Sequence, residues 1–271
     1  MLADVRGYLR EDYRLFHLRD SRAEEIGYHY HEFDKVLFFY AGEVTYLVEG
    51  RVYDLRAGDV LLIPHHQIHQ PIIRSGQPYE RRLLWLSPAL LTEYGLSPCF
   101  DEAAATGSHL LRAGPEERAE ALRLAEELEE AEGGDAFGSH LLARTYCIQL
   151  LIALNRAYEG QKAQDNAQGR RDPKVDAVLA YLRAHLTEDL SVDALAERFH
   201  VSRSGLMSRF KETTGCTIHQ YVVQKRLIRA AELLREGASV RQAAAGSGFQ
   251  DYSTFLRAFR KRYGVSPREL R

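Results

Sequence analysis

Five of the eleven histidines fall between positions 29 and 69: His29, His31, His65, His66 and His69. Imidazoles at such spacing can hold a divalent metal, donate hydrogen bonds to a small ligand, or titrate near neutral pH. Because side chains alternate along a strand, His29 and His31 would project from one face while His69 approaches from a later strand. Three interpretations stay open: a metal site at these three histidines, a metal-free ligand pocket, or side chains with no specific role.

The residues around the histidines have the spacing of antiparallel strands. Short β-branched and aromatic runs fill residues 28–85, and glycines recur every eight residues at positions 42, 50 and 58. Such regular turn signals are typical of strands that close into a barrel or sandwich. We expect a hairpin turn at Glu49-Gly50 and a strand from Val60 to Ile63 that ends at Pro64.

Two motifs in this region resemble those of cupin barrels: Gly27 with His29-Tyr30-His31, and Gly58-Asp59-Val60-Leu61-Leu62-Ile63-Pro64 with His69. Metal-binding cupins carry a Glu four residues after the second His, but here that residue is Lys35, whose charge opposes a bound cation. Glu32 would replace the missing ligand only if the local backbone were displaced. The resemblance therefore favours a metal-free effector pocket over a metal site.

The next expected strand adds candidates to that pocket. Arg81, Leu83 and Trp85 share one face of it, and Trp85 is the only tryptophan of the chain. An indole ring can stack on a sugar, although it fills a core just as often. The predicted effector-binding residues are His29, His31, His69, Arg81 and Trp85.

After Pro115 the apolar residues follow a helical period. Glu116 to Glu132 predicts a charged helix with a narrow apolar stripe, and Phe137 to Tyr158 predicts a much more apolar one. The second helix is too apolar for a surface helix. It would pack on the barrel, and its remaining apolar face suggests either a dimer contact or a bundle within one chain.

The two halves of the chain carry opposite charge. Residues 170–271 contain 19 Lys+Arg and 11 Asp+Glu, a net charge of +8, while the remainder contains 17 and 27, a net charge of −10. Basic domains attract nucleic acids because binding releases counterions from the phosphates. Between the halves, the polar run of residues 159–171 has no apolar periodicity and predicts a flexible linker.

A segment of the basic half occurs twice. Residues 191–202 match residues 239–250 at an offset of 48, which becomes 49 beyond the turn. Each copy has a small residue where two helices touch, a tight turn four residues later, and a capping Ser or Asp before a second helix. These positions are Ala196, His200 and Ser202 in the first copy, and Ala244, Gly248 and Asp251 in the second. Two such copies in register predict a tandem helix-turn-helix.

Helices are also expected around the repeats. Asp172-Pro173 would cap an amphipathic helix, and Ile218 to Arg235 would form a helix that connects the two units. At about 1.5 Å per residue the connector is roughly 27 Å long. One chain would then present two reading helices to adjacent major grooves, about 34 Å apart.

The basic half, which ends in Gly248-Phe249, Phe255, Phe259, Gly264, Ser266 and Pro267, closely resembles the DNA-binding domain of AraC/XylS bacterial transcription regulators. The resemblance implies an α+β protein. A cupin-like antiparallel β-barrel with dimerisation helices (1–158) would sense an effector, often a sugar. A linker (159–171) would lead to an all-α domain with two helix-turn-helix motifs and a connector helix (172–271). It also implies a homodimer that binds double-stranded promoter DNA and RNA polymerase and activates a carbohydrate-utilisation or related metabolic operon.

The residues predicted to read bases lie opposite the apolar pairs Leu206/Phe210 and Phe255/Phe259. They are Arg203, Ser204, Met207 and Ser208 in the first unit, and Tyr252, Ser253, Thr254 and Arg257 in the second. Predicted phosphate contacts are Ser191, Arg209, Lys225, Arg226, Ser239, Arg260 and Lys261. Arg203 and Arg257 are the side chains able to hold a guanine by two hydrogen bonds.

Several other classes of protein fit less well. The sequence shows no apolar run long enough to span a bilayer and no signal-peptide core, so a cytoplasmic protein is expected. Cys99, Cys147 and Cys216 lack metal-ligand or disulfide spacing. A cupin enzyme is disfavoured by Lys35 and by the attached DNA-binding half. A regulator that responds to metal through His29, His31 and His69, or to pH or stress, remains an alternative.

Overall fold

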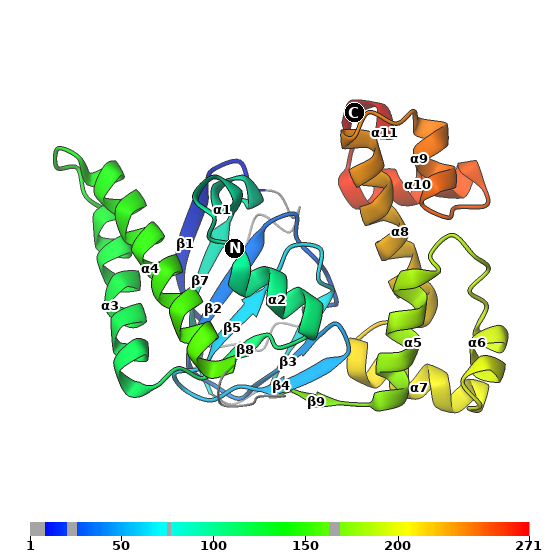
Figure 1. Ribbon diagram of the computed structural model, residues 1–271, viewed down its shortest axis with the longest axis horizontal. Helices are drawn as coiled ribbons and strands as arrows, with labels where there is room; N and C mark the ends of the chain where they lie inside the picture. Colours follow the sequence, from blue (N-terminus) through cyan, green and yellow to red (C-terminus); the bar gives the residue numbers. More distant parts are fainter. Residues whose placement is uncertain (1–8, 21–25, 75–76, 163–168, 271) are drawn as a thin grey trace. The chain divides into compact units, whose positions relative to one another are not determined.

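The computed structural model describes residues 9–20, 26–74, 77–162 and 169–270 (Figure 1). The chain divides into two compact units, residues 1–170 and residues 171–271.

Two antiparallel sheets form the centre of the first unit. The strands are β1 (Tyr13–Asp20), β2 (Asp34–Ala41), β3 (Val44–Val48), β4 (Arg51–Asp54), β5 (Val60–Ile63), β6 (His69–Ile73), β7 (Tyr79–Leu86), β8 (Leu110–Leu111) and β9 (Arg170–Arg171). The five-stranded sheet has the order β1-β7-β2-β5-β8, and the four-stranded sheet has the order β6-β3-β4-β9. The predicted strand at Val60–Ile63 is confirmed at both ends.

Between the sheets lies a cluster of buried side chains that we call the inter-sheet core. Its buried members include Phe33, Leu37 and Phe39 of the β2 region, Tyr46 of β3, and Leu83 and Trp85 of β7. The hairpin between β3 and β4 turns at Glu49 and Gly50, with φ values of 45° and 84°. Both values lie in the left-handed region that two-residue hairpin turns favour. The prediction of this turn is confirmed.

Helices cover the outer face of the five-stranded sheet. They are α1 (Pro88–Tyr94), α2 (Pro98–Thr106), α3 (Pro115–Glu132) and α4 (Ser139–Lys162), and α3 and α4 lie side by side as a hairpin (Figure 1). Apolar residues of these helices join Val36, Phe38 and Leu84 of the sheet in a second core. Both predicted helices are present, but α4 extends to Lys162, so the first four residues of the expected linker are helical. Residues 163–168 of that linker lie outside the described residues.

Strand β1 and helices α1 and α2 were not anticipated from the sequence, and neither were the two-residue strands β8 and β9, the second of which falls at the end of the expected linker. Strand β1 pairs with β7 from Tyr13↔Leu86 to Asp20↔Tyr79. Its residues do not alternate cleanly between apolar and polar, which hides the strand period. Helices α1 and α2 are each only seven to nine residues long. Their start and stop signals are visible, since a Ser-Pro pair begins each helix and a left-handed glycine ends it.

The second unit consists of helices: α5 (Pro173–Ala184), α6 (Val192–Arg198), α7 (Arg203–Thr214), α8 (Ile218–Arg235), α9 (Val240–Gly246), α10 (Tyr252–Tyr263) and α11 (Pro267–Leu270). The connector prediction matches α8 at both ends. The two turns contain His200 at φ 52° and Gly248 at φ 93°, as the repeat predicts. Ser202 and Asp251 cap α7 and α10 by accepting hydrogen bonds from backbone N–H groups. The tandem helix-turn-helix is therefore confirmed.

None of the helices among the described residues combines the length and the apolar character required to cross a bilayer.

Candidate DNA-reading surface and effector site

Helix α7 separates its apolar residues from its polar ones. Leu206 and Phe210 are buried at 2% and 0% exposure, four residues apart, and they fix one face against the rest of the unit. The predicted base-reading residues all lie exposed on the remaining surface: Arg203, Ser204, Met207 and Ser208. Ser208 donates a hydrogen bond to Glu212 at 2.7 Å.

Helix α10 repeats this arrangement, and its apolar and polar residues are more clearly separated than those of α7. Phe255 and Phe259 are fully buried, with ring centroids 5.5 Å apart. The predicted readers Tyr252, Ser253, Thr254 and Arg257 are exposed. The guanidinium of Arg257 lies 3.3 Å from the Thr254 hydroxyl, and among the described residues it forms no ion pair with an acidic side chain. Arg257 is therefore available to a base or phosphate.

The two repeats differ in charge. Residues 191–214 carry four basic and three acidic side chains, whereas residues 239–263 carry five basic and one acidic. In the first repeat Asp193 accepts hydrogen bonds from Arg203 at 2.8 Å. The corresponding residue of the second repeat is Arg241, whose guanidinium lies 5.8 Å from the Tyr252 ring centroid. Sequence reasoning missed the contact between Asp193 and Arg203, although the Asp-to-Arg difference is visible when the repeats are aligned.

The predicted phosphate contacts fall into two groups. Arg209, Arg260 and Lys261 are exposed, Lys225 is half-buried, and Ser191 and Ser239 act as helix caps. Arg226 instead donates hydrogen bonds to the carbonyl oxygens of Leu186 and Glu188, both at 2.8 Å. Partial burial lowers the pKa of Arg226. Its contacts hold α8 to the segment after α5, so Arg226 serves the fold.

In the first unit the structure brings His29, His31 and His69 together. One ring nitrogen of each lies within 4.8 Å of the others. The backbones of His29 and His69 pair through two hydrogen bonds of 2.9 Å. The Nδ1–H groups of these two residues donate to the carbonyls of Gly27 at 2.8 Å and Gln67 at 2.9 Å. This orientation directs Nε2 of both rings away from those carbonyls, as in many metal sites.

Lys35 changes what this cluster can bind. Its Nζ lies 2.9 Å from Nε2 of His69, and because Nδ1 of His69 carries the hydrogen, Nε2 accepts from Lys35. Burial lowers the pKa of Lys35 to about 7, and burial together with the nearby Lys35 charge holds the pKa of His69 well below its usual value. A dication at His69 would meet the ammonium group, so these residues fit a metal ion poorly.

The other predicted effector residues also face the inter-sheet core. Arg81 is 3% exposed, pairs with Asp20 of the neighbouring strand, and lies 4.0 Å from the Tyr79 ring centroid. Trp85 stacks on Phe33 with ring centroids 4.5 Å apart. Its Nε1 is buried and lacks a hydrogen-bond partner among the described residues. Trp85 and Lys35 are direct cross-strand neighbours.

The side chains of His65 and His66 form hydrogen bonds with acidic side chains. Asp34 accepts from the backbone N–H of His65 at 2.9 Å and from its Nδ1 at 3.0 Å. This hydrogen bond raises the pKa of His65. His66 Nε2 lies 3.1 Å from a Glu32 carboxylate oxygen. Glu32 is thus engaged by His66 and does not replace the carboxylate absent at position 35.

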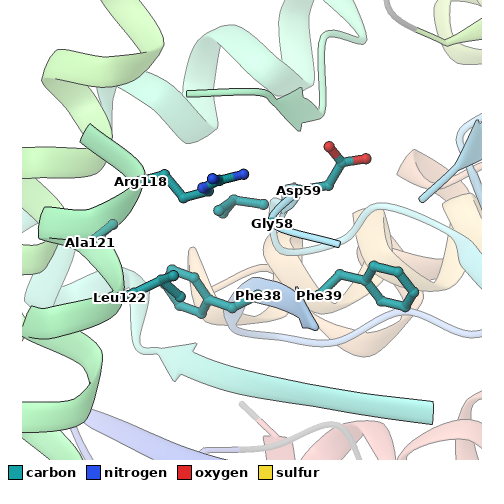
Figure 2. Close-up of a pocket in the computed structure, with 8 residues that line it drawn as sticks. Phe38, Phe39, Gly58, Asp59, Arg118, Ala121 and Leu122 are labelled. Atoms are coloured by element: carbon teal, nitrogen blue, oxygen red, sulfur yellow. The ribbon is translucent and has the colours of Figure 1, made fainter. Parts of the chain in front are cut away.

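A small hollow of about 10 Å³, room for roughly one water molecule, lies on the helix-covered side of the sheet. Figure 2 shows Arg118 of α3 extending over Gly58 and Leu122 facing Phe38. A Cβ atom at Gly58 would lie 2.7 Å from the Arg118 guanidinium, so α3 closes tightly over this turn. The lining is mainly apolar, and the hollow is a packing gap between sheet and helix.

Known families match both units. Residues 15–151 match the family described as AraC-like ligand binding domain, and residues 195–271 match a helix-turn-helix domain family. The chain belongs to the AraC family. As a member it is a helix-turn-helix transcription regulator with a ligand-binding domain, which confirms the resemblance drawn from the repeats.

Two relatives of this AraC-family chain are similar over most of its length. The HTH-type transcriptional activator RhaS of Salmonella arizonae is 28% identical over 249 residues, 90% of this chain and 86% of that protein. RhaS of Escherichia coli O139:H28 is 26% identical over 247 residues, with the same coverage. Among solved structures, the DNA-binding domain of the global transcriptional factor AdpA, in complex with a target DNA, is 30% identical. It covers 36% of this chain and 89% of that chain, with a TM-score of 0.35.

Proposed function

We propose that the chain is a ligand-responsive transcription activator that reads promoter DNA with the exposed faces of α7 and α10. The observation that carries the proposal is the exposed Arg257, held on a helix whose opposite face is fixed by Phe255 and Phe259. A bidentate contact from arginine to guanine discriminates by about 1–3 kcal/mol. The other proposed readers are Arg203, Ser204, Met207, Ser208, Tyr252, Ser253 and Thr254.

Phosphate contacts would position these two helices on the duplex. We propose this role for Arg209, Arg260 and Lys261, with Lys225 and the capped helix starts at Ser191 and Ser239 beside them. Arg226 is left out because its guanidinium is already bonded to two carbonyls. Contacts to phosphates add affinity and salt dependence without reading sequence.

The inter-sheet core would hold the effector. The match of this region to a ligand-binding domain supports the proposal, and His31, His69, Lys35 and Trp85 supply polar groups inside it. Effector binding would shift the population between a DNA-competent and an incompetent state. Similarity to the RhaS proteins, which are named as transcriptional activators, supports activation. Contact with RNA polymerase and a carbohydrate-utilisation or related metabolic target are further parts of the proposal. No catalytic role is proposed.

A second copy of the chain is the proposed partner of the first unit. Phe137, just before α4, and Leu141 and Leu142, in its first turn, are exposed at 108%, 68% and 47%. Large apolar side chains grouped in this way are typical of protein interfaces. Leu141→Glu should shift a dimer towards monomer in sedimentation equilibrium, while Gln149→Glu on the same helix should not. Equal behaviour of both variants would place the interface elsewhere.

The central experiment measures binding to the promoter beside the chain's own gene and to random DNA of equal length, across a salt series. Wild type should prefer the promoter. Arg257→Ala should lose roughly 10- to 100-fold of that preference, since a bidentate contact is worth about 1–3 kcal/mol. Its salt slope should stay nearly unchanged, because the slope reports phosphate contacts.

Arg268→Ala is the matched control, because Arg268 is an exposed arginine of the same unit on α11. It should keep the preference of wild type. A wild-type protein that binds promoter and random DNA equally, with and without candidate effectors, would contradict the proposed function.

A further inference from the structure

We propose that the effector of the inter-sheet core bears a carboxylate, which accepts hydrogen bonds from Lys35 Nζ and Trp85 Nε1. The inference rests on the proposed function, because it names the chemical class of the ligand to which the regulator responds. It is carried by two buried donors that the described residues leave without an anionic acceptor of their own.

The charge of Lys35 meets no counter-charge within the described part of the chain. Lys35 is 5% exposed, and its Nζ contacts the neutral His69 ring at 2.9 Å. No Asp or Glu oxygen of the described residues contacts Nζ. Arg81, a second buried cation of this core, differs because it pairs with Asp20. Burying an ammonium group without an anion is strongly unfavourable, and two of its three N–H donors remain for a ligand.

Trp85 provides the second donor beside the first. In the pairing of β2 with β7, Trp85 lies directly opposite Lys35, and both side chains enter the same core. Opposite residues in such a pair have Cβ atoms about 4.5–5.5 Å apart. The indole is held by stacking on Phe33 and by an edge contact with Phe16, at centroid distances of 4.5 and 4.7 Å. Its Nε1–H is buried without an acceptor among the described residues.

The chemistry of these two groups selects the ligand. Both are donors, and one is a cation, so the complementary group is an acceptor with negative charge. A carboxylate offers two acceptor oxygens and forms stronger hydrogen bonds with charged donors than a hydroxyl does. A neutral sugar hydroxyl would satisfy Trp85 but leave the Lys35 charge uncompensated. The aromatic rings of Phe33 and His31 next to Trp85 would flank the body of the ligand.

The test uses the single tryptophan as its probe. The full-length protein is titrated at constant pH and ionic strength with acid and neutral partners: acetate and acetamide, benzoate and benzamide, D-galacturonate and D-galactose. We expect a saturable change in Trp85 fluorescence with at least one acid, at a concentration at least 10-fold below that of its neutral partner. The uronate and benzoate arms distinguish an acidic sugar from an aromatic acid.

Two variants connect the response to the proposed contacts. Lys35→Gln should weaken acid binding at least 10-fold, whereas Lys174→Gln, at an exposed lysine of the other unit, should bind as wild type does. Trp85→Phe keeps an aromatic ring but removes the Nε1–H donor. Because this variant has no tryptophan to report binding, its affinity for the acid, which should be weaker, is measured by thermal shift. Two results would overturn the inference. One is that Lys35→Gln binds the acids as tightly as wild type does, and the other is that the neutral partners bind wild type as tightly as the acids.

The same preparations are assayed for binding to promoter and random DNA, both with and without the acids. Promoter preference combined with no carboxylate response would overturn this inference alone and leave the proposed function standing. Equal binding of promoter and random DNA by wild type under both conditions would contradict the proposed function itself. The two failures are therefore separated by one set of samples.

Discussion

Nη1 of Arg203 lies 2.8 Å from both carboxylate oxygens of Asp193, which joins the first reading helix to the helix before it. The second repeat cannot form the equivalent contact, because the residue that corresponds to Asp193 is Arg241. The first repeat thus holds its reading arginine with an acid, whereas the second repeat has a cation at the same place. The second repeat should provide most of the electrostatic attraction to DNA.

Removing this acid should strengthen DNA binding. An exposed ion pair is worth about 0.2–1 kcal/mol, so freeing Arg203 in Asp193→Asn should raise affinity up to roughly 5-fold. Glu197→Gln removes the same charge from the same helix without touching Arg203. It should give a smaller gain in a binding assay at the same salt concentration. Weaker binding by Asp193→Asn would show that Asp193 positions Arg203 for DNA.

Gly248 should tolerate no side chain. A Cβ atom there would lie 2.2 Å from the Leu186 carbonyl oxygen, and its φ is 93°. Gly237 has the same φ of 93°, but a Cβ atom added to it would meet no atom within 4 Å. Gly237→Ala should therefore cost only the backbone strain, about 1–2 kcal/mol. Gly248→Ala should cost more in the free energy of unfolding, measured by the loss of helical circular dichroism, and similar values would contradict the steric argument.

Lys35→Met should stabilise the first unit in the absence of ligand. Replacing a buried ion pair by apolar side chains of similar volume often gains about 1–4 kcal/mol, and removing the unpaired ammonium of Lys35 should act in the same direction. The pKa of Lys35 is about 7 in the folded chain and 10.5 when unfolded, so the unfolded state binds more protons between these values. Wild-type stability should rise with pH over that range, and the advantage of Lys35→Met should shrink from pH 6 to pH 9. Urea unfolding followed by Trp85 fluorescence checks this, and a constant difference would contradict it.

The pair of His65 and Asp34 predicts the opposite pH dependence. Hydrogen bonding to Asp34, with the charges of Asp34, Glu32 and Asp101 nearby, raises the pKa of His65 above its ordinary value. The stabilisation is fully present below that ordinary value and is lost as pH rises through the raised one. His65→Gln should therefore destabilise the first unit more at pH 5.5 than at pH 8.5. His140→Gln, at an exposed histidine of the same unit, should show no such difference.

Most of the second unit could be predicted from the sequence, because its information is local and occurs twice. Caps, left-handed turns and apolar pairs at positions such as Ser202, Gly248 and Phe255 each specify a helix boundary or a buried face. The agreement of two copies removes the ambiguity of a single match. What the repeat does not reveal is which exposed side chains contact one another, as Asp193 and Arg203 do.

In the first unit, most strands could be predicted from the sequence, but the contacts within the proposed effector site could not. The sequence predicted the cluster of His29, His31 and His69 from strand parity, but in the structure His29 forms only an isolated bridge to His69 and the strand begins at Asp34. The substitution at Lys35 is visible against the cupin pattern. The sequence does not reveal that Lys35 reaches His69, or that Asp20 pairs with Arg81, because both contacts join residues far apart in the chain. Strand β1 was missed because its residues do not alternate cleanly between apolar and polar.

The bonds from Arg226 to the carbonyls of Leu186 and Glu188 have a consequence for the operator. They tie the connector helix to the segment that leads into the first helix-turn-helix, while Gly248 places the second turn against that same segment. The two reading helices are thus braced at a set separation. Inserting one base pair between the half-sites turns one of them by about 34° around the duplex axis. Two reading helices held at a fixed separation cannot adjust to that rotation. The number of base pairs between the half-sites should therefore be as strictly specified as the bases within them.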